Sequence, residues 1–207
     1  MQYSLFQDEE VIKEAEKLRM VTISFTGHRP NKLGGYNMKN PTMLLLKEKL
    51  LLLLEELIVN QNMSRFISGG ALGFDQASFW CVHILKKKYP HIQNIVAIPF
   101  EYQDKVWTPE QKEWYKKMLA VADEIIDVSR LPEYDTKESP HLPYEEYSSK
   151  KMQKRNEYMV DHSHIVIACY DGTSGGTGNC VRYAKSAEGI HAIIQLNPKN
   201  NFEQSIL

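Results

Sequence analysis

Ser68-Gly69-Gly70-Ala71-Leu72-Gly73-Phe74-Asp75 is a turn of small residues between two segments of different character. The short apolar run before it, residues 65–67, predicts a strand, and residues 76–88 after it have the spacing of a helix. A strand, a small-residue turn and a helix together are how α/β proteins present free backbone N–H groups to an anion. The spacing does not match the dinucleotide fingerprint G-x-G-x-x-G, and a tight turn that only caps a helix is the alternative interpretation.

The rest of the chain repeats this alternation of short apolar strands and helices. The pattern predicts further strands at residues 21–26, 95–98, 124–128, 164–170 and 191–196. It predicts further helices at residues 8–18, 41–60, 108–122 and 144–161, and from the turn that ends at residue 178 to about residue 188. Such alternation predicts an α/β fold in which helices cover both faces of one mainly parallel sheet, a three-layer sandwich.

Length and composition restrict the class of protein. For 207 residues we expect one domain, 1–207, with a leading helix at 1–20, a loop or lid at 129–143 and a polar, peripheral tail at 197–207. The formal net charge of −1 argues against a dedicated binder of duplex DNA but leaves room for a local basic patch. Three scattered cysteines, the lack of a signal-peptide pattern and the charges that interrupt residues 43–59 predict a cytoplasmic protein without a membrane span.

Every unusual turn of the chain follows a predicted strand. These turns are residues 27–36, 68–75, 99–107 and 171–178. Because the carboxyl ends of parallel strands meet at one edge of a sheet, and ligands of such sheets bind outside that edge, we expect the four turns to build one site.

The residue types in these turns favour an anionic ligand. Glycine-rich turns at helix N-termini offer N–H groups and a favourable dipole, and the guanidinium of Arg29 can hold two oxygens at once. For Arg29 the alternative is a surface residue in a rigid turn, and His28 either donates to a phosphate or caps the strand. The hydroxyls of Ser174 and Thr177 are donors to a ligand or ordinary turn residues.

Other candidate residues have plainer interpretations. The aromatic side chains Tyr36, Phe100, Tyr102 and Trp107 suit stacking on a base, but for each of them we favour core or rim packing. Arg155 and Asn156 fit a solvated helix face by charge pattern alone. His162 and His164 lack a third ligand nearby, so we expect a structural role and no metal site.

The motifs taken together resemble a known family. The stretch Thr26-Gly27-His28-Arg29-Pro30-Asn31-Lys32-Leu33-Gly34-Gly35-Tyr36 is similar to the opening signature of the YpsA-like proteins of the SLOG superfamily. The turn at 68–75, Pro99-Phe100, Arg155-Asn156 and Gly175-Gly176-Thr177 agree with it, so the resemblance covers residues 21–196. The glycine turn and the Arg-Asn pair are shared with DNA-processing protein A, which binds single-stranded DNA.

The resemblance implies a Rossmann-like fold with a pocket for nucleotides or nucleotide-derived molecules. Members of the superfamily include phosphoribohydrolases of the "lonely guy" type and sensor domains that bind signalling nucleotides related to ADP-ribose in antiphage defence. The phosphoribohydrolases carry a glutamate in the helix after Pro-Gly-Gly-x-Gly-Thr. Here the turn at 171–178 lacks that proline and residues 179–183 contain no carboxylate.

We therefore expect a cytoplasmic binding protein for a nucleotide or an ADP-ribose-like derivative, a homo-oligomer by analogy, with no cofactor. The expected ligand-binding residues are Gly27, His28, Arg29, Pro30, Ser68, Gly69, Gly70, Ala71, Gly73, Asp75, Phe100, Arg155, Asn156, Asp171, Gly175, Gly176 and Thr177. One alternative is a hydrolase of a nucleotide N-glycosidic bond, for which Glu101 and Asp75 are the candidate catalytic carboxylates. A further alternative is a single-stranded nucleic-acid binder, which would weaken steeply with salt.

Overall fold

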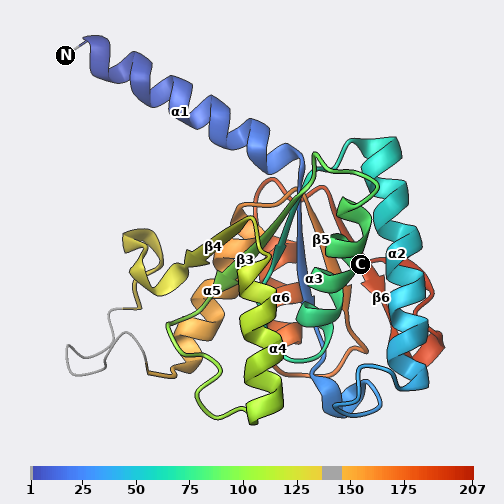
Figure 1. The fold of residues 1–207 in the computed structure, drawn as a ribbon. Helices are drawn as coiled ribbons and strands as arrows, with labels where there is room; N and C mark the ends of the chain where they lie inside the picture. Colours follow the sequence, from blue (N-terminus) through green and yellow to red (C-terminus); the bar gives the residue numbers. More distant parts are fainter. Residues whose placement is uncertain (1, 137–145) are drawn as a thin grey trace.

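A seven-stranded sheet forms the centre of the computed structural model of the protein, which describes residues 2–136 and 146–207 (Figure 1). The strand order is β4-β3-β2-β1-β5-β6-β7. Six neighbouring strands are parallel: β1 (Thr22–Gly27), β2 (Arg65–Ser68), β3 (Gln93–Ile98), β4 (Glu124–Asp127), β5 (Ile165–Cys169) and β6 (Ala192–Leu196). The predicted α/β class with a mainly parallel, Rossmann-like sheet is confirmed.

Helices cover both faces of this sheet, and the direction of chain growth decides which face each one takes. From β1 to β4 the chain moves toward one edge through α2 (Pro41–Gln61), α3 (Phe74–Lys86) and α4 (Pro109–Ala120). It then returns to place β5 beside β1, and α5 (Ser149–Asp161) and α6 (Gly176–Ser186) lie on the opposite face (Figure 1). Strand order therefore reverses between β1 and β5, which is where sheets of this kind bind their ligands.

Local sequence signals explain the start of each helix on the first face. Pro41 takes the first position of α2, and the side chain of Asn40 accepts a hydrogen bond from the N–H of Met43. Thr108 and Gln111 form a reciprocal capping box at the start of α4. The third helix, α3, begins at Phe74, two residues earlier than predicted, because Gly73 adopts a φ of 102° that directs the chain straight into the helix.

The main core lies between the sheet and the α2–α3 layer. Phe25 and Phe74 meet edge to face with ring centroids 6.1 Å apart, and Phe66 lies 6.4 Å from Phe25. A Cβ atom on Gly27 would lie 2.4 Å from the Phe74 ring, so only glycine fits at the end of β1. The first expected site residue is therefore needed for packing, whatever else it does.

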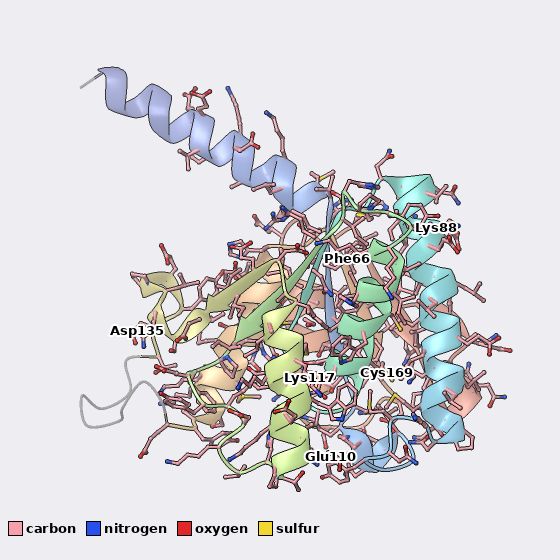
Figure 2. All side chains as sticks on the ribbon, viewed as in Figure 1. Phe66, Lys88, Glu110, Lys117, Asp135 and Cys169 are labelled. Atoms are coloured by element: carbon pink, nitrogen blue, oxygen red, sulfur yellow. The ribbon has the colours of Figure 1, made fainter. Side chains whose placement is uncertain are left out.

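The leading helix, α1 (Gln2–Met20), extends away from the body at the edge of the sheet where β1 begins (Figure 1). The side chains of residues 9–18 are exposed, whereas Phe66 and Cys169 lie within the domain (Figure 2). The last turn of α1 is tied to the body, because the guanidinium of Arg19 donates to the carbonyl oxygen of Gly189.

The predicted loop or lid at 129–143 is only partly described. Its first residues form two short 3₁₀ turns, η2 (Val128–Arg130) and η3 (Pro132–Tyr134), and residues 137–143 lie outside the described part of the chain. The predicted helix start at residue 144 lies outside it as well. The helix itself begins at Ser149, because Ser148 caps it through the N–H groups of residues 150 and 151.

The predicted polar tail lies at the edge of the sheet, but it contains structure that the sequence analysis did not expect. Residues 197–207 contain the turn η4 (Pro198–Asn200) and the strand β7 (Gln204–Ile206), which pairs antiparallel with β6. Asn201 and Phe202 reverse the chain with φ values of 56° and 57°, and the Phe202 side chain is 1% exposed. Polar composition concealed this element, since a three-residue edge strand carries too few side chains to show a pattern.

Replacing Phe202 tests whether the tail stabilises the fold. We expect Phe202→Ala to lower the free energy of unfolding by about 3–5 kcal/mol, the usual loss for a buried aromatic side chain. Ile206→Ala is the control, because Ile206 lies in the same tail but is 70% exposed. Urea denaturation measures both variants, and equal small losses of unfolding free energy would mean that Phe202 does not anchor the tail to the fold.

Candidate site at the carboxyl edge of the sheet

The four unusual turns lie at the same edge of the sheet, as the parallel strand order requires. The edge is at the bottom of Figure 2, where Glu110 in the first turn of α4 is labelled, and Lys88 beyond α3 marks the opposite edge. Hydrogen bonds connect the turns directly. The N–H of Phe74 donates to the carbonyl oxygen of His28 at 3.2 Å, and Gln103 Nε2 donates to the carbonyl oxygen of Gly69 at 3.3 Å.

A buried ion pair lies beneath the turn after β2. Arg155 Nη1 of α5 is 3.4 Å from Asp75 Oδ2 of α3, and the two residues are 4% and 6% exposed. The pair therefore joins the helical layers of opposite faces across the edge of the sheet. A Cβ on Gly69 would lie 1.3 Å from Arg155 Nη1, so the guanidinium occupies the space that a side chain would take. The interpretation of Arg155 as part of a solvated helix face is wrong.

The electrostatics of the pair follow from its burial. Burial raises the pKa of Asp75, and the positive charge of Arg155 opposes that rise. The charge of Arg29 also acts on Asp75. The Asp75 carboxylate further accepts a hydrogen bond from the N–H of Ala71 at 3.4 Å, so it holds its own turn together.

The turn at 68–75 is closed. Ser68, Gly69, Gly70, Ala71 and Gly73 are all buried. Several N–H groups at the start of α3 already have backbone partners, since those of Phe74, Gln76 and Ala77 donate to carbonyl oxygens. The turn at 68–75 is therefore a tight turn in which several N–H groups at the start of α3 already have hydrogen-bond partners.

The turn before α6 is open by contrast. Gly175 precedes the helix with a φ of 137° and provides no side-chain cap, and Gly176 is exposed. A Cβ on either glycine would meet no atom of the described residues within 4 Å. The N-terminus of α6 therefore faces open space, where its N–H groups and dipole favour an anion.

Asp171 holds the base of this open turn. His28 Nε2 lies 2.8 Å from its Oδ1, the hydroxyl of Thr173 donates to it at 2.6 Å, and Lys32 and Lys199 lie within 3.4 Å. Burial acts to raise the pKa of Asp171, but the hydrogen bonds from Thr173 and the charge and hydrogen bond of His28 outweigh it, so the pKa lies well below its usual range. Burial lowers the pKa of His28, although the charge and the hydrogen bond of Asp171 oppose that shift. His28 therefore links β1 to β5 instead of facing outward.

A groove of about 870 Å³ opens between α5 and α6 and reaches the first turn of α6. Arg29, which is exposed, lies on it together with Asn156 and Gly176. Among residues 2–136 and 146–207, no carboxylate lines the groove, and none lies in ion-pair distance of Arg29. The lining residues are Arg29, Tyr147, Ser149, Lys150, Met152, Gln153, Asn156, Gly176, Asn179, Arg182, Tyr183 and Ser186.

Several expected residues lie elsewhere. Phe100 is buried, packs edge to face on Tyr147 and lies under the Lys151 ammonium. Glu101 pairs with Arg130 at 3.1 Å. Trp107 packs against Tyr115. Pro30 is buried at the start of a short 3₁₀ turn after β1.

The two histidines that we expected to be structural occupy other parts of the molecule. His162 stacks on Tyr158 at 4.1 Å, and His164 stacks on His191 at 4.9 Å. Within residues 2–136 and 146–207, no three His, Cys, Asp or Glu side chains gather to hold a metal ion.

Sequence reasoning missed the far wall of the groove. Asn179, Arg182, Tyr183 and Ser186 of α6 line it, although residues 179–183 drew attention only for their lack of a carboxylate. Their spacing of three to four residues was the available signal, because such positions share one face of a helix. A polar helix face of that kind usually indicates exposure to solvent, so the sequence pattern gave no reason to expect a groove beside it.

The fold and the groove together define a Rossmann-like α/β protein with an anion-favouring edge. The chain belongs to the YspA SLOG family, whose sequence model matches residues 23–191. It is 60% identical over 169 residues to the SPbeta prophage-derived protein YoqJ of Bacillus subtilis strain 168, covering 82% of this chain and 97% of that protein. It is 33% identical over 157 residues to a UPF0398 protein of Lysinibacillus sphaericus, covering 76% and 80% of the two chains.

Among solved structures, the fold is similar to that of DNA processing protein A from Helicobacter pylori. The TM-score is 0.52 at 16% identity, and the match covers 90% of this chain and 73% of that one. In the described ranges no helix has the length and apolar character needed to cross a membrane.

Gly69→Ala tests the ion pair beneath the turn. The new methyl group must displace the Arg155 guanidinium and leave two buried charges unpaired, so we expect unfolding free energy to fall by about 3–5 kcal/mol. Gly176→Ala is the matched control, because its methyl group would meet nothing. Urea denaturation that found the two variants equally stable would contradict this role of Gly69.

Asp171→Asn tests the linkage of the open turn to pH. A carboxylate whose pKa is depressed in the folded state stabilises the protein above its unfolded pKa of about 3.9 and loses that contribution as pH falls below it. We expect the variant to be less stable than wild type at pH 7 and to lose less stability between pH 5 and pH 3. Denaturation curves across that range measure the slope, and parallel curves for the two proteins would refute the assignment.

Proposed function

We propose that the protein binds a nucleotide or nucleotide-derived ligand, such as an ADP-ribose-like molecule, with its phosphate at the mouth of the α5–α6 groove. One observation carries the proposal: Arg29 and the uncapped N-terminus of α6 line the same groove. A guanidinium supplies two parallel donors to a phosphate, and the first-turn N–H groups supply more.

The balance of charge around the edge supports an anion. Arg29, Arg155, Lys32 and Lys199 bring four positive charges, and the carboxylates within this group are Asp75 and Asp171. This edge therefore has a surplus of positive charge, even though the whole chain has a net charge of −1. Phosphate at the groove would offset it.

The buried Arg155 adds a second indication of an electrostatic role for this edge. Its Nε atom is buried and has no hydrogen-bond partner among the described residues, and the same holds for the hydroxyl oxygen of Ser68. Unsatisfied buried polar groups are rare because each one has a desolvation cost. Arg155 therefore serves the site by its charge and by holding the turn, and the direct contacts fall to Arg29, Gly176 and Thr177.

Binding is favoured over hydrolysis of an N-glycosidic bond. A hydrolase needs a carboxylate beside the ribose. The two candidates are otherwise engaged, since Asp75 is buried against Arg155 and Glu101 pairs with Arg130. The groove lining contains neither of them.

Calorimetry with a panel of nucleoside mono- and diphosphates and ADP-ribose tests the proposal. We expect Arg29→Ala to weaken phosphate-bearing ligands by roughly 1.5–3 kcal/mol, the range for hydrogen bonds to charged groups. Lys39→Ala is the control, because Lys39 is an exposed cation of the same loop that does not line the groove. Absence of heat with every ligand in the wild-type protein would end the proposal.

Two further measurements separate the alternatives. Chromatography of the mixture after incubation distinguishes binding, which leaves the ligand intact, from hydrolysis, which releases a base. The Helicobacter pylori relative by fold is described as binding single-stranded DNA. An oligonucleotide that bound more tightly than any nucleotide, with a steep dependence on salt, would assign the groove to nucleic acid instead.

A further inference from the structure

The far wall of the groove carries a second arginine that the proposed phosphate contact does not use. Arg182 lies on α6 and lines the same groove as Arg29. Its Nη1 donates to Asn179 Oδ1 at 3.2 Å, and Asn179 also lines the groove. The hydrogen bond draws the guanidinium back toward the start of the helix, because Asn179 precedes Arg182 by about one turn.

This arrangement brings Arg182 toward the open N-terminus of α6. Gly176 and Asn179 are three residues apart, which is about 4.5 Å along a helix axis at 1.5 Å per residue. Within the described residues, no carboxylate lies in ion-pair distance of Arg182. Two guanidinium groups and a helix N-terminus therefore face one groove, and no negative side chain is among the described residues that line it.

The amount of positive charge exceeds what one phosphate offsets. A phosphate monoester carries about −1.5 to −2 charges at pH 7. Two arginines carry two full charges, and the helix terminus adds about half a charge. The volume of about 870 Å³ is toward the upper end of the roughly 300–1,000 Å³ that small-molecule sites span.

We propose that Arg182 is a specificity-determining residue that selects ligands with two linked phosphates over monophosphates. The inference rests on the proposed function and narrows its ligand class to nucleoside diphosphates and their diesters. Arg29 and the first-turn N–H groups of α6 receive one phosphate, and Arg182 receives the other. Asn179 holds the Arg182 guanidinium in place, so it acts as a positioning residue.

Calorimetry with AMP, ADP and ADP-ribose, and with inorganic phosphate and pyrophosphate as probes without a base, tests this inference. We expect the wild-type protein to bind ADP at least tenfold more tightly than AMP, and pyrophosphate at least tenfold more tightly than inorganic phosphate. Arg182→Ala should weaken the diphosphates about tenfold and the monophosphates less than twofold. Lys185→Ala is the matched control, since Lys185 is an exposed cation of the same helix outside the groove lining.

The outcomes separate this inference from the proposed function. Equal losses for mono- and diphosphates in Arg182→Ala, or no loss at all, would overturn the role of Arg182 and leave nucleotide binding intact. If the wild-type protein gave no binding heat with any phosphate compound, both the role of Arg182 and the proposed function would be wrong. Asn179→Ala gives a second readout: we expect it to weaken the binding of ADP more than that of AMP, and an unchanged preference for the diphosphate would contradict the positioning role. Unfolding curves verify that each variant is folded.

Discussion

The ion pair between Arg155 and Asp75 is the constraint on which the carboxyl edge depends. It joins α5 on one face of the sheet to α3 on the other, and it does so in the space left by the missing side chain of Gly69. Buried charges are costly to separate, so each partner keeps the other in place. The turn after β2 is thereby held shut, and the edge is left with one closed and one open glycine turn.

The two glycine turns look alike in sequence and differ in their use. At 68–75 the chain closes on itself, because Asp75 accepts from the N–H of Ala71 and the start of α3 donates to backbone carbonyls. At 171–178 the carboxylate of Asp171 is turned toward His28 and Thr173, which leaves Gly175 and Gly176 facing open space. The placement of one aspartate therefore decides whether a glycine turn becomes a packed corner or an exposed helix start.

Much of the fold could be predicted from the sequence, because short β-branched runs and capped helices report local structure. The bounds of β6 and α4 lie within two residues of expectation. Contacts between residues far apart in the sequence could not be predicted, because no local pattern indicates that Arg155 is buried beneath Gly69 or that the tail buries its own Phe202 in the core. At the site, the turns and Arg29 were identifiable, whereas Arg182 was not, since an exposed arginine on a polar helix face has the same local signature with or without a facing groove. The roles of the individual site residues stay predictions.

The parallel course of α5 and α6 has an orienting effect on whatever enters between them. Both helices begin at the carboxyl edge, so the positive ends of their dipoles lie side by side and the electrostatic potential declines from the mouth of the groove toward Ser186. An elongated molecule that is charged at one end and neutral at the other has two possible entry directions of unequal energy. The two dipoles favour the direction that puts the charged end at the mouth and the neutral end toward Tyr183, so the backbone alone favours one orientation before any side chain discriminates.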